Sequence, residues 1–318
     1  MDDSAKNVSD NTGAMEAAST HEEENEELIN LPAGTDFTPE TSVGITAANL
    51  TRVILLAGEA DSGKTTLLVS LYQKFNEGHF AGFRFAGSDS LNGWERRCHL
   101  SQIASGNVKA DTGRTIGLTQ SLLHLRVRRD TDKPQDILFG DLSGELFRAV
   151  CDSTEECKRL SVIKRADTFV LLIDGERLSD TSIRHGAFHS ARALLRSCLD
   201  AQMLDQTSLV DVVCSKYDLV QARLAETEEY LRHTREKIET EFKSRLGRLR
   251  FFDVAARPDT DVLPFGYGLD ALFPSWVEDS PYLRRSLEYA PKMPTQTTEF
   301  DRFLERQLVS TSRVKTTK

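Results

Sequence analysis

Residues 58–65 read GEADSGKT, which is the pattern G-x-x-x-x-G-K-T. An apolar run at 53–57 comes before them, and apolar residues recur at helical spacing after them: Leu67, Leu68, Leu71, Tyr72 and Phe75. A strand, a glycine-containing turn and a helix in this order build a phosphate-binding loop, because the backbone N–H groups of the turn can point at the phosphates. The alternative, a glycine turn that only joins a strand to a helix, is disfavoured once the flanking segments are taken into account. We therefore predict a P-loop (Walker A motif) and a nucleotide-binding protein.

Each position of this loop has an expected role. The two glycines allow the backbone to approach a β-phosphate closely. Lys64 supplies a positive charge to the β- and γ-phosphate oxygens, and the Thr65 hydroxyl is a ligand for Mg²⁺. We expect Lys64 to face solvent when no nucleotide is bound. The predicted nucleotide-contacting residues of the loop are Gly58, Asp61, Ser62, Gly63, Lys64, Thr65 and Thr66.

A second motif begins at the end of a predicted buried strand, 136–141, whose last residue is a carboxylate. It reads Asp141-Leu142-Ser143-Gly144-Glu145, the pattern D-x-x-G-E. Because ligands of doubly wound sheets lie beyond the carboxyl ends of the strands, Asp141 is placed to hold Mg²⁺ through water. The N–H of Gly144 can meet a γ-phosphate. A plain turn after a strand would look similar, so this motif depends on its position after the P-loop.

A third motif indicates which base is bound. The run at 208–214 ends in Ser215-Lys216-Tyr217-Asp218, which matches N/T-K-x-D with serine in the first position. The carboxylate of Asp218 can accept hydrogen bonds from N1–H and the exocyclic amino group of guanine, a pair of donors that adenine does not present. The stem of Lys216 can lie over the base. Ser215 is shorter than asparagine, so its bracing of the P-loop is expected to be weaker. The predicted ligands are GTP and GDP with Mg²⁺.

Taken together, these motifs resemble a Ras-like P-loop GTPase of the translation-factor-related (TRAFAC) class over about residues 50–280. The chain is similar, more closely, to the bacterial double-GTPase domain of the second type, at residues 80–87 (FAGFRFAG), 95–99 (ERRCH), 141–148 (DLSGELFR) and 166–175 (ADTFVLLIDG). The resemblance implies that Ala255 or Ala256, in the counterpart of the S-A-K loop, receives the guanine carbonyl through a backbone N–H. It also implies a GTP-hydrolysing switch in a bacterial multi-gene conflict (anti-phage) system, acting on a partner protein encoded nearby.

The motifs specify the catalytic residues less fully than the binding residues. Either Thr115 or Thr119 could be the switch threonine that meets Mg²⁺, and Thr115 is favoured because it lies in a T-I-G sequence. Glu145 stands where Ras-like enzymes usually have a water-orienting glutamine, so unassisted hydrolysis is expected to be slow. Arg114 could act as an arginine finger in cis, or simply face solvent. The predicted catalytic residues are thus Lys64, Glu145, Arg114 and Thr115, and the predicted metal ligands are Thr65, Thr115 and Asp141.

The charge of the chain is concentrated at one end. The 318 residues carry a net charge of −9, and residues 1–48 hold eleven acidic side chains against one basic side chain, Lys6. This composition predicts a disordered tail at 1–48. A GTPase domain is expected at 49–280, with a helical insertion at about 77–114. A C-terminal extension with a short amphipathic helix is expected at 281–318.

Within the predicted domain, helical patterns at 146–165, 180–203, 222–246 and 269–278 alternate with the strands. This alternation predicts an α/β fold with a doubly wound, mostly parallel sheet and helices on both faces. No run has the length of a membrane span, no signal-peptide pattern is present, and five scattered cysteines fit reduced thiols, so we expect a cytoplasmic protein. The alternatives to a GTPase switch are a GTP-binding scaffold without independent hydrolysis and an ATPase.

Overall fold

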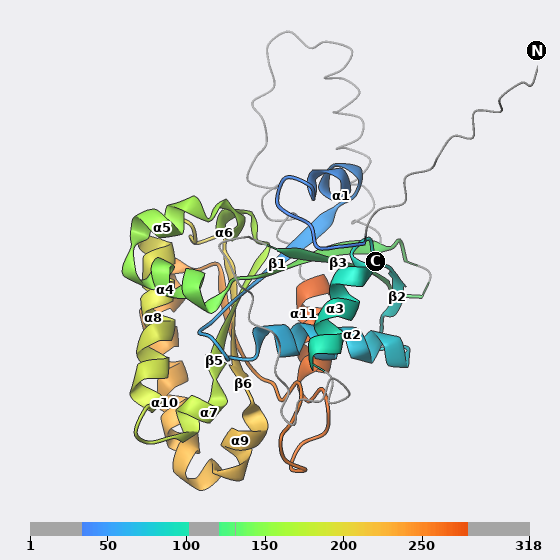
Figure 1. Ribbon diagram of the computed structural model, residues 1–318. Helices are drawn as coiled ribbons and strands as arrows, with labels where there is room; N and C mark the ends of the chain where they lie inside the picture. Colours follow the sequence, from blue (N-terminus) through green and yellow to red (C-terminus); the bar gives the residue numbers. More distant parts are fainter. Residues whose placement is uncertain (1–33, 102–120, 131, 279–318) are drawn as a thin grey trace, which may run out of the picture. The chain divides into compact units, whose positions relative to one another are not determined.

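A seven-stranded sheet forms the centre of the protein in the computed structural model, which describes residues 34–101, 121–130 and 132–278. The strand order is β2-β3-β4-β1-β5-β6-β7 (Figure 1). The strands are β1 (Thr51–Ala57), β2 (Arg84–Gly87), β3 (Leu122–Arg128), β4 (Gln135–Asp141), β5 (Thr168–Asp174), β6 (Leu209–Ser215) and β7 (Arg248–Asp253).

The sheet is parallel except around β3. Strand β1 pairs in parallel with β4 and β5, and the parallel ladder continues through β6 to β7. Strand β3 is antiparallel to both β4 and β2. The register aligns Leu56 with Asp141 and Asp174 with Ser215. The predicted doubly wound, mostly parallel α/β fold is therefore confirmed, and the strand ends that carry the predicted motifs lie at one edge of the sheet.

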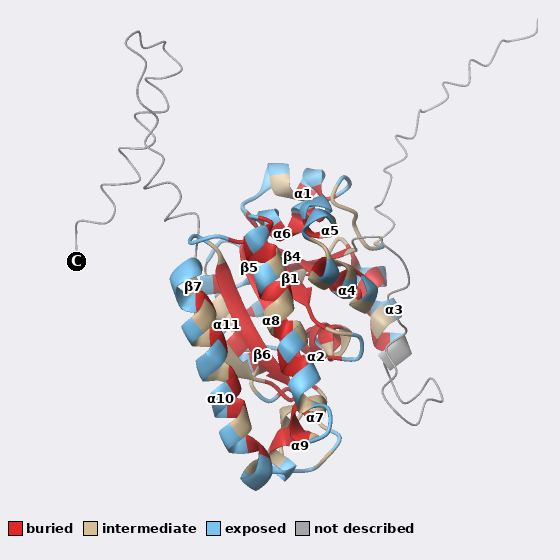
Figure 2. Ribbon diagram, turned by 90° about the vertical axis from the view of Figure 1, so that its left-hand side faces the viewer, coloured by how far each residue is buried: buried red, intermediate tan, exposed pale blue. Residues whose placement is uncertain are grey.

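Helices cover both faces of this sheet because successive side chains of a strand point to opposite sides. In β1, Val53, Leu55 and Ala57 belong to one apolar core, while Ile54 and Leu56 belong to the other. The first face is covered mainly by α4 (Gly144–Asp152), α5 (Thr154–Arg159), α6 (Ser161–Arg165), α8 (Arg184–Asp200) and α10 (Leu224–Phe242). The second face is covered by α2 (Lys64–Glu77), α3 (Leu91–Ser101) and α11 (Leu269–Glu278). Figure 2 shows the buried strands between helices whose outer faces are exposed.

Three shorter helices complete the described elements: α1 (Val43–Ala48), α7 (Gly175–Ser179) and α9 (Tyr217–Ala222), with a 3₁₀ turn at Lys243–Arg245. The helix expected at 146–165 is divided into α4, α5 and α6. Ser153 has an extended backbone and its hydroxyl accepts from Glu156 N–H, which caps a new helix, and Leu160 leaves the helical conformation again. Strand β2 and helix α1 were not expected, because both are short and lack a clear apolar period.

Residues 34–48, which the composition assigns to the acidic tail, instead pack on the domain. Phe37 forms a backbone bridge with Leu122, and the guanidinium of Arg97 donates two hydrogen bonds to the Asp36 carboxylate, at 2.8 and 2.7 Å. These partners are far apart in the sequence, so local composition does not reveal them. Residues 1–33 and the predicted C-terminal amphipathic helix lie outside the described residues. None of the helices in the described ranges is long and apolar enough to cross a membrane.

Candidate nucleotide-binding site

The loops that follow β1, β4, β5, β6 and β7 meet at one edge of the sheet, since these strands run in parallel. They carry the P-loop, the Asp141–Gly144 motif, the segment at Asp174, the Ser215–Asp218 motif and the pair Ala255 and Ala256. In open α/β sheets this edge is where ligands bind. The fold therefore brings together motifs that are up to about 200 residues apart in the sequence.

The P-loop needs its two glycines for different reasons. A β-carbon on Gly58 would lie 2.6 Å from Ser62 Oγ and 2.9 Å from the Leu172 carbonyl oxygen, so no side chain fits there. Gly63 has φ of +84°, and Asp61 also has a positive φ, of 63°. Left-handed residues turn successive N–H groups into a concave surface that suits anions, and aspartate tolerates this conformation better than most residues. The loop ends where α2 begins, with Gly63 as its N-cap.

Lys64 is buried, contrary to the expectation that it would face solvent. Its side chain lies across the loop, and Nζ donates to the carbonyl oxygens of Gly58 at 3.1 Å and Glu59 at 2.9 Å. Burial lowers the pKa of this ammonium group, and the nearby carboxylates of Asp141 and Asp61 oppose that effect. The two carbonyl oxygens thus fix the position of the ammonium group within the loop.

Thr65 and Asp141 are in direct contact, as expected of residues that share a metal ion. The Thr65 hydroxyl donates to Asp141 Oδ2 at 2.8 Å, while the other carboxylate oxygen, Oδ1, is buried without a hydrogen-bond partner. Burial raises the pKa of Asp141, whereas Lys64 and Thr65 lower it. Mg²⁺ prefers oxygen ligands of this kind and is usually bound through one or two carboxylates together with phosphates. Within the described ranges, no group of three or more His, Cys, Asp or Glu residues could hold a metal ion without such help.

Gly144 lies directly against the P-loop. A β-carbon on this residue would be 2.7 Å from the backbone nitrogen of Ala60, so only glycine allows this approach. Gly144 is the first residue of α4, and the Ser143 hydroxyl caps the helix by accepting from Leu146 N–H at 3.2 Å. Glu145 follows in the first helical turn and is exposed.

The base-reading motif is at the end of β6. Asp218 is buried, and its Oδ2 accepts from Asp259 N–H at 2.9 Å, which orients the carboxylate. Lys216 has a left-handed backbone with φ of 47°. The Ser215 hydroxyl donates to the Ile173 carbonyl oxygen at 3.2 Å, and its Oγ lies 3.9 Å from a β-carbon built on Gly63 of the P-loop. The structure thus places Lys216 and Asp218 together at the sheet edge.

The two candidate alanines differ in their backbone contacts. Ala255 N–H donates to the Tyr267 carbonyl oxygen at 3.1 Å, so it is already used. Both alanines are buried, and Ala256 accepts through its carbonyl oxygen from Gly266 N–H at 3.1 Å. The amide of Ala256 is therefore the better candidate for a guanine carbonyl.

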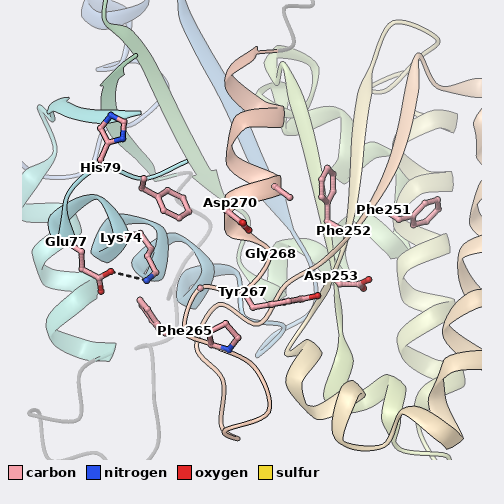
Figure 3. Close-up of a pocket in the computed structure, with 14 residues that line it drawn as sticks. Lys74, Glu77, His79, Phe251, Phe252, Asp253, Phe265, Tyr267, Gly268 and Asp270 are labelled. Carbon is pink, nitrogen blue, oxygen red and sulfur yellow. Dashed lines mark hydrogen bonds and ion pairs between the residues drawn. The ribbon is translucent and has the colours of Figure 1, made fainter. Parts of the chain in front are cut away.

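An open pocket of about 860 Å³ lies beside the loop that carries Ala255 and Ala256, between the end of α2 and the start of α11 (Figure 3). Aromatic rings and charged side chains line it, and Lys74 Nζ lies 4.7 Å from the centre of the Phe265 ring. Tyr267, in the pocket wall, stacks on Tyr217 of the base-reading motif, with ring centres 6.2 Å apart. The base end of the site is thus bordered by aromatic side chains from two loops.

One element of the site was not predicted. Helix α7 follows β5 directly and carries Asp174 as its N-cap, with Glu176 and Arg177 within its five residues. All three side chains make ion pairs with the predicted motifs. The position of Asp174 at the carboxyl end of a buried strand beside β1 was the available signal. Arg114, Thr115 and Thr119 lie outside the described residues, so the choice of switch threonine remains a prediction.

These strands and loops have the architecture of a P-loop NTPase. A family model described as Double-GTPase 2 matches residues 52–277, which is more than half of the chain. The chain therefore belongs to the Double-GTPase 2 family. No curated protein matches it.

Two solved structures are similar to this chain. The signal recognition particle receptor SRb-GTP/SRX complex from Chaetomium thermophilum is 15% identical, with a TM-score of 0.39, and the match covers 71% of this chain and 97% of the other. The Ski7 GTPase-like domain of S. cerevisiae, bound to GTP, is 14% identical, with a TM-score of 0.40, over 74% of this chain and 52% of the other.

Proposed function

We propose that this protein is a Mg²⁺-dependent GTP-binding and GTP-hydrolysing switch whose hydrolysis is slow without a partner. One observation carries the proposal. Two motifs lie at the same edge of the sheet: a P-loop whose lysine, Lys64, is buried, and a base-reading motif whose carboxylate, Asp218, is also buried. Membership of the Double-GTPase 2 family supports the choice of guanine. It also supports the wider proposal of a role in a bacterial conflict system with a partner encoded nearby.

The roles of the residues follow from their positions. Lys64 and the N–H groups of residues 58–66 bind the phosphates, and Gly144 contacts the γ-phosphate. Asp218 and Lys216 hold the guanine, with the amide of Ala256 at its carbonyl. Thr65 and Asp141 would hold Mg²⁺, which when bound neutralises phosphate charge. Ordering of the switch segments by the γ-phosphate would then be the signal that a partner protein detects.

A direct binding assay separates this proposal from its alternatives. Purified full-length chain with Mg²⁺ is titrated with GTP and ATP, and phosphate release is followed in the same samples. Preference for GTP with slow release supports the switch. GTP binding with no release supports a scaffold, an alternative that Glu145 favours because a carboxylate would repel the γ-phosphate. Preference for ATP would contradict the guanine assignment.

Replacing Asp141 with asparagine should remove most of the effect of Mg²⁺ on GTP affinity. The buried carboxylate would lose its charge, while the oxygen of the new amide could still accept from the Thr65 hydroxyl. We expect Mg²⁺ to raise GTP affinity about tenfold or more in the natural chain and less than about twofold in the variant, since a charged ligand is lost. The measurement compares GTP affinity in Mg²⁺ and in EDTA. Asp152→Asn, at an exposed position of the same helix α4, is the matched control, and an undiminished Mg²⁺ effect in Asp141→Asn would contradict the proposed metal ligand.

Replacing Glu145 with glutamine should accelerate hydrolysis by about tenfold, by removing repulsion from the γ-phosphate and restoring a group that both donates and accepts. Single-turnover phosphate release on the purified variants measures this. In the competing arrangement, Glu145 itself positions water while Arg114 offsets its charge. Glu145→Gln and Arg114→Ala would then both slow the reaction. If the natural chain hydrolyses GTP quickly and Glu145→Gln abolishes this activity, the protein needs no partner for hydrolysis.

A further inference from the structure

Helix α7 packs tightly against the base-reading motif. A β-carbon added to Gly175, its first residue, would lie 2.2 Å from the Ser215 carbonyl oxygen and 3.0 Å from that of Lys216. It would also lie 2.9 Å from Val220 Cγ2, on α9. Any displacement of α7 therefore displaces the loop that carries Lys216 and Asp218, because densely packed contacts transmit movement.

Two carboxylates at the start of α7 hold Lys216. Its Nζ donates to Asp174 Oδ2 at 3.0 Å and to Glu176 Oε2 at 2.8 Å. Burial disfavours the charged form of Lys216, but its contacts with Glu176 and Asp174 raise the pKa overall. Asp174 is itself buried and is fixed by accepting from Glu176 N–H at 2.9 Å. The two carboxylates thus fix the position of the ammonium group.

The next residue of α7 contacts the P-loop. Arg177 forms an ion pair with the carboxylate of Glu59, and these side chains are only 37% and 18% exposed. Glu59 is also the residue whose carbonyl oxygen accepts from Lys64 Nζ at 2.9 Å. Arg177 therefore holds a part of the loop that positions the phosphate-binding lysine.

We propose that Asp174, Glu176 and Arg177 are positioning residues that couple the phosphate-binding loop to the base-reading loop. This inference rests on the proposed GTP-binding function. The coupling runs from Glu59 through Arg177 and the short α7 to Lys216. It adds to the direct contact of Ser215 with the P-loop, where Ser215 Cβ and Oγ lie 3.7 and 3.9 Å from a β-carbon built on Gly63.

The test uses a change at the phosphate end and measures discrimination at the base end. GDP and inosine diphosphate differ only in the 2-amino group, from which Asp218 is placed to accept a hydrogen bond. The ratio of their dissociation constants therefore reports on base reading alone. A purely local effect of Arg177 on the phosphates would change both dissociation constants by the same factor and leave the ratio as it was.

In the full-length chain, Arg177→Ala is expected to raise the Kd for GDP about fivefold and to lower the ratio about threefold, effects in the range of a partly buried ion pair. Arg177→Lys keeps the charge and should restore at least half of the lost discrimination. The double variant Arg177→Ala with Glu59→Gln removes the unpaired carboxylate near the phosphates. It should keep the reduced ratio, which separates coupling from simple charge repulsion.

Glu241→Gln is the matched control. This carboxylate is 22% exposed and bridges Arg192 and Arg196 between α8 and α10, outside the candidate site. It should leave both dissociation constants within about twofold, with thermal unfolding measured on every variant to confirm folding. If the natural chain binds GDP and folded Arg177→Ala has an unchanged ratio of the two dissociation constants, the coupling is wrong but the proposed function stands. A natural chain that binds neither nucleotide would refute the proposed function, and the coupling with it.

Discussion

Replacing Lys64 with methionine is expected to raise the Kd for GTP at least about a hundredfold, equivalent to about 2.7 kcal/mol. The charge that meets the phosphates is lost, and a hydrogen bond to a charged group contributes about 1.5–3 kcal/mol. Methionine is chosen because the stem of Lys64 is buried and alanine would leave a cavity. Isothermal titration with GTP, in Mg²⁺, measures the change.

The stability of this variant should be close to that of the natural chain. Burial lowers the pKa of Lys64, so its charged form contributes no net stability, and removing it offsets the loss of the two bonds to Gly58 and Glu59. Lys243→Met is the control, because Lys243 pairs with Glu239 at the end of α10 and lies outside the candidate site. Undiminished GTP affinity in Lys64→Met would show that the P-loop does not bind phosphate.

Replacing Asp218 with asparagine is expected to reverse the choice of base. GTP affinity should fall about a hundredfold. The carboxylate accepts hydrogen bonds from two N–H groups of guanine, whereas the NH₂ of asparagine is a donor and would face one of these donors. Xanthosine triphosphate should then bind better than GTP, because its carbonyl can accept from the new amide. The fold should persist, as the side-chain oxygen of asparagine can still accept from Asp259 N–H.

Competition between the two triphosphates for the purified variant measures this preference. Asp200→Asn is the control, because Asp200 ends helix α8 and pairs with Arg245, outside the candidate site. A preference for GTP that survives in Asp218→Asn would remove Asp218 from the base contact. The ATPase alternative would then need to be examined again.

Much of the fold could be predicted from local patterns. Strands β1 and β5 contain the continuous apolar runs 53–57 and 169–173, which are visible in the sequence because strands covered on both faces need no polar residues. The long helices α8 and α10 could also be predicted within a few residues, from their apolar stripes. Short elements such as α1 and β2 could not, because four to six residues carry too little periodicity.

The candidate site divides in the same way. GEADSGKT, D-x-x-G and S-K-x-D are contiguous motifs, so the residues in them and their order were available from the sequence. The placement of Lys64 was not, and the expectation that it faces solvent was wrong. Its burial depends on how the loop folds back over its own carbonyl groups. Helix α7 escaped prediction because it has only five residues and because Arg177 and its partner Glu59 are over a hundred residues apart in the sequence.

Local sequence was enough to predict the class of fold, the family and three candidate nucleotide-binding motifs, because each depends on residues close together in the chain. How those motifs are joined depends on the folded packing: Gly144 touches Ala60, Asp259 orients Asp218, and α7 links the P-loop to Lys216. Ion pairs and close backbone contacts form only within a narrow range of distances and angles. The packing of the helices on the sheet creates that geometry, which cannot be predicted from any stretch of contiguous residues.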